Sequence, residues 1–184
     1  MIIYIHGFAS SGQGGKAVEF REYFKSIGEP FIAPSLSYVP QLAIDTLEEL
    51  VESYDNVTLI GSSLGGYYAI YLAEKYGLKA VLINPAVQSV STLAHAADLK
   101  GLACNYFDGS SFTWNESHVE MLQNYSVEAN SKDYLLMLQK GDEVLDYKSA
   151  IEKVPNARLI LEEDGHHSFE KIERYFETIR EFLL

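Results

Sequence analysis

The chain has 184 residues, 47% of them hydrophobic and 22% charged, a composition typical of a soluble globular protein. Its 26 acidic and 14 basic residues give a net charge of -12, which argues against a nucleic-acid partner because an acidic surface repels phosphate backbones. No segment reaches the ~20 apolar residues that a membrane span needs, so we expect no membrane span.

The N-terminal residues enter a strand-like apolar run at once, without the basic and cleavable regions of a secretory signal. Cys104 is the single cysteine and cannot form an intrachain disulfide, which fits a reducing compartment. It also has no neighbouring cysteine or histidine cluster, so we expect no metal site. These features predict a cytoplasmic protein.

Short apolar runs alternate with helical patterns, which is typical of a parallel sheet wound with helices. We expect helices at 16–27, 41–54 and 64–76, and a last helix that begins at about Phe169. Near-continuous apolar runs predict buried strands at 2–5, 31–33, 57–60, 80–83, 134–138 and 158–161. The sequence therefore predicts an α/β fold, one domain over 1–184 with about six mostly parallel strands and helices on both faces.

The segment between the fourth and fifth of these strands breaks the rhythm. It is rich in polar residues and glycine, yet it holds Tyr106, Phe107, Phe112 and Trp114. Segments of this length inside a compact domain are often lids over a binding site. We expect a lid-like insertion over 88–131, and leave open the alternative that it adds packing helices with no role in binding.

The sequence GSSLG at 61–65 lies between a predicted strand and a predicted helix. This Gly-x-Ser-x-Gly pattern in a strand–turn–helix context is typical of a nucleophile elbow, with Ser63 as the nucleophile. Glycine is needed at 61 and 65 because side chains there would collide with the neighbouring strand and helix. The backbone N–H of Leu64 opens the helix and is expected to stabilise an oxyanion.

A second oxyanion donor is expected from the loop after the first strand, which reads HGFASS at 6–11. Gly7 would let this backbone approach the site, and the N–H of Phe8 would point inward. His6 is expected to shape the loop through a local hydrogen bond rather than to act as the base.

The same loop continues with a glycine-rich run that ends at Lys16, which invites comparison with a phosphate-binding loop. That pattern requires glycine at position 10 and Ser or Thr at position 17. Ser10 and Ala17 stand there instead. A nucleotide-hydrolysing enzyme is therefore disfavoured.

A serine nucleophile needs a base, and the base needs an acid that fixes its tautomer. In this fold the acid follows a strand and precedes the histidine in the chain. Asp142 follows the fifth predicted strand and is the first choice, with Glu143 and Asp146 as competitors. Asp146 could instead cap a helix that begins near Tyr147.

The base is expected between the last strand and the last helix, where His166 and His167 stand side by side. We favour His167, on the expectation that the last helix begins near Ser168 and holds His167 at its N-terminus. His166 would then lie in a freer part of the loop.

Several motifs together resemble the YqiA-type bacterial esterases over nearly the whole chain. They are HGFxSS at 6–11, GSSLGGYYA at 61–69, NPAV at 84–87, GDEVLDY at 141–147 and GxHxF at 165–169. The resemblance implies an α/β-hydrolase fold and hydrolysis of carboxylic esters or acyl thioesters without a cofactor. By position it implies Ser63, Asp142 and His167 as the catalytic residues, and it registers His166 at a variable position.

The sequence thus predicts a serine esterase or thioesterase that acts on a small-molecule ester or acyl thioester through an acyl-serine. Two alternatives stay open at this point. One is a hydrolase-like binding protein without turnover, and the other is a peptidase or acyltransferase with the same three residues.

Overall fold

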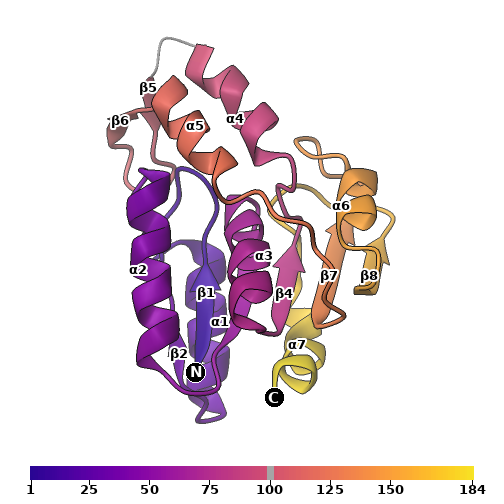
Figure 1. Ribbon diagram of the computed structural model, residues 1–184. Coiled ribbons are helices and arrows are strands. Elements are labelled where there is room, and N and C mark those ends of the chain that lie inside the picture. Colours follow the sequence, from indigo (N-terminus) through magenta and orange to yellow (C-terminus); the bar gives the residue numbers. More distant parts are fainter. Residues whose placement is uncertain (99–101) are drawn as a thin grey trace.

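The computed structural model describes residues 1–98 and 102–184. Its main sheet is formed by six parallel strands in the order β2-β1-β3-β4-β7-β8 (Figure 1). They are β1 (Ile2–Ile5), β2 (Phe31–Ile32), β3 (Thr58–Ser62), β4 (Ala80–Ile83), β7 (Tyr134–Gln139) and β8 (Arg158–Glu162). The predicted α/β fold and its six strands are confirmed, with strand ends that differ from the predicted ones by at most two residues.

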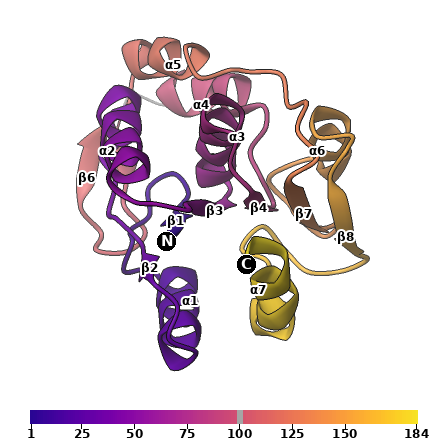
Figure 2. The same cartoon turned by 60° about the horizontal axis from the view of Figure 1, so that its bottom comes forward.

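Alternate residues of each strand supply two separate apolar layers, because successive side chains point to opposite faces of a sheet. Ile3 and Ile5 pack in the layer beneath α2 (Pro40–Ser53), α3 (Leu64–Tyr76) and α6 (Tyr147–Lys153). Ile2 and Tyr4 pack in the opposite layer, beneath α1 (Gly15–Ser26) and α7 (Phe176–Leu183). Figure 2 shows α1 and α7 together on one side of the sheet and the other helices across from them.

The insertion lies beyond the carboxyl ends of the strands (Figure 1). It contains α4 (Ser89–Asp98), α5 (Glu116–Gln123) and an antiparallel pair that the sequence did not predict, β5 (Leu102–Cys104) with β6 (Ser111–Thr113). Trp114 is only 1% exposed, and its indole Nε1 donates a hydrogen bond to the Leu93 carbonyl at 3.0 Å. The insertion therefore contains packing helices and Trp114 belongs to the core, while a role of the insertion as a lid stays a prediction.

The expected start of the last helix at about Phe169 was wrong. Residues 163–171, which we call the histidine loop, are followed by a single 3-10 turn (Ile172–Tyr175), and α7 begins only at Phe176. Phe169 and Lys171 have φ angles of 60° and 56°, and this left-handed backbone cannot continue an α-helix. His167 is therefore nine residues upstream of α7 and is not held at the N-terminus of a helix. Among the helices of the described ranges, none has both the length and the apolar character that crossing a bilayer requires.

Candidate active site

Ser63 lies in the tight turn that joins β3 to α3, with φ 54° and ψ -121°. A non-glycine residue adopts this backbone only where its surroundings enforce it. Here the N–H of Ser63 donates to the Ile83 carbonyl at 3.1 Å, and its own carbonyl accepts from the N–H of Ala86 at 2.9 Å. The turn is thus anchored to the end of the neighbouring strand β4.

The two glycines of the elbow allow this close packing. A Cβ on Gly61 would overlap the backbone of Gly65 at the start of α3. A Cβ on Gly65 would overlap the backbone of Ile5 at the end of β1. A side chain at either position would therefore collide with a neighbouring element, as the sequence led us to expect. The turn requires glycine at both positions for this reason.

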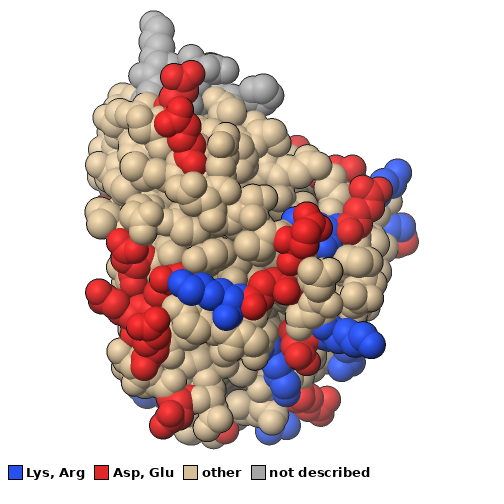
Figure 3. All heavy atoms as spheres, viewed as in Figure 1, with Lys and Arg blue, Asp and Glu red and all other residues tan. Residues whose placement is uncertain are grey.

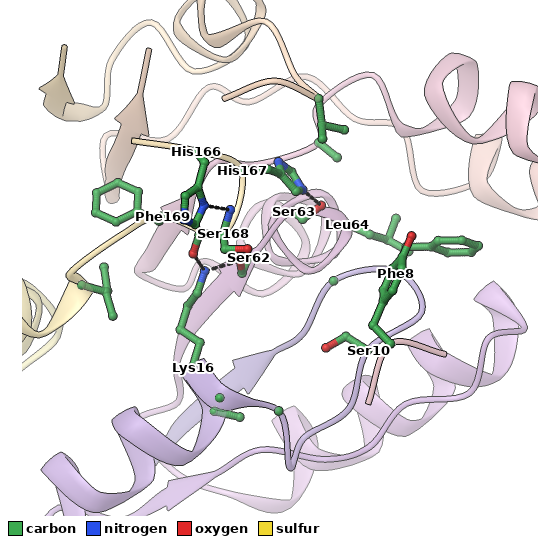
Figure 4. A pocket seen from close by; sticks show the side chains of 18 of the residues that line it. Phe8, Ser10, Lys16, Ser62, Ser63, Leu64, His166, His167, Ser168 and Phe169 are labelled. Carbon is green, nitrogen blue, oxygen red and sulfur yellow. Dashed lines mark hydrogen bonds between the residues drawn. The ribbon is translucent and has the colours of Figure 1, made fainter. Parts of the chain in front are cut away.

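The structure brings together the three residues that the sequence singled out. His167 Nε2 lies 2.9 Å from Ser63 Oγ (Figure 4). On the other side of the ring, His167 Nδ1 lies 2.8 Å from Asp142 Oδ2. Both distances are within hydrogen-bond reach. The imidazole therefore stands between a hydroxyl and a carboxylate, in the arrangement in which a histidine can take a proton from one and be oriented by the other.

The Asp142 side chain is 3% exposed, and both of its carboxylate oxygens accept hydrogen bonds. Its Oδ1 accepts from the backbone N–H groups of Val144 and Leu145, both at 2.8 Å, and its Oδ2 faces His167. Burial acts to raise the pKa of Asp142, but the hydrogen bonds from His167 and from these two N–H groups outweigh it, so the pKa lies below its ordinary value. Asp142 is therefore ionised at neutral pH.

The competing residues have other partners. Glu143 accepts the backbone N–H of His167 at 3.1 Å and does not touch its ring. Asp146 accepts the N–H of Lys148 at 3.0 Å and caps α6, as the alternative for it proposed. His166 accepts the N–H of Ser168 on Nδ1 and faces Glu170 with Nε2 at 3.1 Å.

Two buried amides that the sequence analysis missed hold the histidine loop. Asn84, 2% exposed, donates through Nδ2 to the carbonyls of His166 and His167, both at 3.1 Å, and accepts the N–H of Gln139. Gln139, 1% exposed, accepts through Oε1 from the N–H groups of His166 and Glu170. Both residues stand at the ends of apolar strands, and Asn84 also opens the NPAV motif at 84–87, but neither signal indicated this role. These two amides fix the backbone at His166 and His167, a role that the sequence analysis had given to the N-terminus of the last helix.

The loop after β1 reaches the elbow as expected. A Cβ on Gly7 would meet the Ser63 Cβ at 3.1 Å, so glycine permits the approach. Among the described residues, neither the N–H of Phe8 nor that of Leu64 has an acceptor, and both residues line the cavity at Ser63. The Phe8 ring packs edge-on against two rings of the insertion, with centroid distances of 4.8 Å to Trp114 and 5.6 Å to Phe112. The insertion therefore supports this loop.

His6 is 7% exposed and does not face Ser63. Its Nδ1 donates to the Gly7 carbonyl at 2.8 Å, and its Nε2 accepts the N–H of Leu36 at 2.9 Å. Burial lowers the pKa of His6 and favours the neutral ring that this pattern requires. The expected structural role of His6 in the loop agrees with these contacts.

A cavity of about 1050 Å³ opens at Ser63. It is bordered by the start of α1, the elbow, the insertion and the histidine loop. Its lining includes Lys16, Leu64 and His166, which Figure 4 labels, and Leu93 and Tyr106 of the insertion. The volume is close to the upper limit of about 1,000 Å³ for small-molecule sites. Within the described ranges, no group of three or more His, Cys, Asp or Glu side chains is arranged to hold a metal ion.

The family described as "Uncharacterised protein family (UPF0227)" matches residues 1–184. The chain belongs to the UPF0227 family. A UPF0227 protein of Vibrio parahaemolyticus is 26% identical over 99% of this chain and 98% of its own length. A UPF0227 protein of Pasteurella multocida is likewise 26% identical, with the same coverage. The resemblance seen in the sequence motifs is thus confirmed for the whole chain.

Solved structures show the same fold. Alpha/beta hydrolase domain-containing protein 10 from mouse superimposes with a TM-score of 0.77 at 21% identity, over 99% of this chain and 88% of its own. Est1E from Butyrivibrio proteoclasticus, solved with bound ferulic acid, gives 0.77 at 18% identity, over 99% and 87%. At these identities the likeness concerns the fold, and the fold of this UPF0227 member is that of the α/β-hydrolases.

Proposed function

We propose that this protein is a serine hydrolase that cleaves a carboxylic ester or acyl thioester of a small molecule through an acyl-serine intermediate. The observation that carries the proposal is the continuous chain of hydrogen bonds from Ser63 Oγ through His167 to Asp142. A serine hydroxyl becomes an effective nucleophile when such a base removes its proton.

In the first half of the reaction, His167 Nε2 takes the proton from Ser63 Oγ as the oxygen attacks the substrate carbonyl. The N–H groups of Leu64 and Phe8 stabilise the oxyanion that forms. His167 then gives its proton to the departing alcohol or thiol, which leaves the acyl group on Ser63. Asp142 holds Nδ1 protonated throughout and stabilises the imidazolium.

In the second half, a water molecule replaces the leaving group. His167 takes a proton from this water as it attacks the acyl-serine, and the same two N–H groups again face the oxyanion. Collapse of this intermediate returns the proton to Ser63 and releases the carboxylic acid. These reaction steps need no cofactor, and the exposed Cys104 takes no part in them.

The test compares wild-type protein with Ser63→Ala on p-nitrophenyl esters and acyl-CoA thioesters of graded chain length. We expect turnover of at least one series and a loss of several orders of magnitude in kcat with Ser63→Ala, at an unchanged melting temperature. Turnover that survives in the variant would remove Ser63 from the chemistry. Binding of these compounds without turnover by wild type would favour the binding-protein alternative, and transfer of the acyl group to an acceptor other than water would favour the acyltransferase.

A further inference from the structure

The second residue of α1 brings a positive charge to the cavity at Ser63. We propose that Lys16 binds an anionic group of the substrate, a carboxylate attached on one side of the scissile ester. The proposal rests on the hydrolase function proposed above and names a substrate class for it.

Lys16 Nζ lies between the immediate neighbours of the two reacting residues. It donates to Ser62 Oγ at 3.3 Å and to the backbone carbonyl of Ser168 (Figure 4). Ser62 directly precedes Ser63, and Ser168 directly follows His167. An ammonium group has three N–H donors, and these contacts account for two of them. A substrate that lies against Ser63 therefore comes close to a charged donor with capacity for a further bond.

The charge itself is the feature that needs a ligand. Lys16 forms no ion pair with a carboxylate among the described residues, whereas Lys75, Lys140 and Lys153 pair with glutamates at 2.6 to 3.8 Å. Partial burial of an ammonium is costly unless an anion compensates it. A neutral glutamine could donate to the same hydroxyl and carbonyl without that cost. A positive charge at this point is therefore better explained by an anion that enters the cavity.

The surroundings of Lys16 add to the local positive potential. The N-cap residue of α1, Gly14, offers no side-chain cap, and the first turn of the helix holds no acidic residue. The free N–H groups at this helix end carry a partial positive charge. Elsewhere the surface is acidic, with carboxylates gathered along α2 (Figure 3) and a net charge of -12. Glu19, Glu170 and Glu173 also line the cavity, so Lys16 supplies a local positive charge beside Ser62 and Ser168 and does not make the whole cavity positive.

Burial lowers the pKa of Lys16 to about 8, while the charges of Glu19 and Asp142 act to raise it. Lys16 is therefore charged at neutral pH and loses its charge as the pH rises through about 8. Tyr4, which also lines the cavity, has a pKa raised by burial and stays neutral over this range. His166, another ionisable residue of the cavity lining, has Glu170 as its partner at 3.1 Å. The preference for an anionic substrate should therefore fade above pH ~8.

Three matched esters test the proposal: ethyl butyrate, which is neutral; monoethyl succinate, with a carboxylate on the acyl side; and carboxymethyl butyrate, with a carboxylate on the alcohol side. Hydrolysis is followed for all three by acid release at constant neutral pH. The variants are Lys16→Met and Lys16→Gln, with Lys25→Met as the control because Lys25 is an exposed lysine of the same helix. Melting curves check that each variant folds.

We expect wild type to prefer one of the two anionic esters, and which one shows on which side of the bond Lys16 lies. Both Lys16 variants should lower kcat/KM for that ester by about tenfold or more, as for loss of a charge-assisted hydrogen bond. Hydrolysis of ethyl butyrate should change by less than about threefold, and Lys25→Met should change neither. Wild type without a preference, or a uniform loss on all three esters that Lys16→Gln restores, would contradict the proposal and make Lys16 a brace for the histidine loop.

Binding separates this proposal from the hydrolase function. Calorimetry measures the affinity of Ser63→Ala for monoethyl succinate and carboxymethyl butyrate, with and without Lys16→Met. If no ester is turned over, the proposed function fails, but loss of binding with Lys16→Met would still support the anion site. Equal binding by both proteins, or no binding by either, would overturn it.

Discussion

The serine elbow and the histidine loop reach the same cavity, but they are held there by different means. The elbow is marked by glycines two residues before and after Ser63, and the assembled sheet then anchors it through Ile5 and Ile83. The histidine loop is tied down by side chains that are distant in the chain, with Asn84 82 residues from His166 and Asp142 25 residues from His167. The elbow can therefore be recognised from a short local pattern, whereas the residues that hold the histidine loop come together only in the assembled sheet.

Removal of the base is the most severe way to break the distant half. His167→Ala should lower kcat by roughly a thousandfold or more, because Ser63 then has no group to take its proton. His166→Ala should lower kcat by about tenfold or less, since its ring contacts Ser168 and Glu170 and not Ser63. Initial rates of ester hydrolysis for the two purified variants measure the ratio. The reverse ranking would make His166 the base and would mean that the loop is held differently from Figure 4.

Loss of the Asn84 amide should loosen the histidine loop, although Ser63, Asp142 and His167 are all still present. Asn84→Ala removes the donors to the carbonyls of His166 and His167 and leaves the N–H of Gln139 without its acceptor. We expect a decrease in kcat of about tenfold to a hundredfold, with little change in KM, and a loss of stability of about 1–3 kcal/mol from the unpaired buried groups. Urea unfolding and steady-state kinetics measure the two effects.

Asn156→Ala is the control for this experiment, since Asn156 is exposed and donates only a long hydrogen bond of 3.4 Å. It should change neither quantity measurably. Full activity of Asn84→Ala would mean that the histidine loop keeps its position without the buried amide, and the contrast between the two regions would lose its basis.

The smallest expected change in activity concerns the brace behind the oxyanion loop. Trp114→Phe removes the hydrogen bond to the Leu93 carbonyl and part of the packing on Phe8. We expect a loss of stability of about 1–3 kcal/mol and a change in kcat of less than about tenfold, with the same order of preference among acyl chain lengths. A large shift in chain-length preference at unchanged stability would instead give Trp114 the role of a residue in a substrate cover.

The sequence predicted best what depends on neighbouring residues. The six strands followed from apolar runs, and the elbow followed from the spacing of Gly61, Ser63 and Gly65, because steric limits of a tight turn act over a few positions. Lys16 was seen only as part of a failed phosphate-loop pattern, since its place beside Ser62 depends on how α1 packs on the sheet.

The histidine loop shows the limit most clearly. Its left-handed residues Phe169 and Lys171 carry side chains that give no sign of this backbone, so the helix was expected several residues too early. The amides of Asn84 and Gln139 look like ordinary strand ends until the sheet brings them beneath the loop. Likewise Trp114 lies in a polar segment, and only its packing on Phe8 and Leu93 reveals it as a core residue.

The central claim is that Ser63 is the activated nucleophile of this cavity. Treatment with a fluorophosphonate probe, followed by peptide mass spectrometry, tests it directly, because the probe forms a stable adduct with a serine whose hydroxyl is activated by a base. The account predicts one adduct, on Ser63, that is absent from Ser63→Ala and strongly reduced in His167→Ala. An adduct on another residue, or no adduct on a protein that still hydrolyses esters, would contradict it.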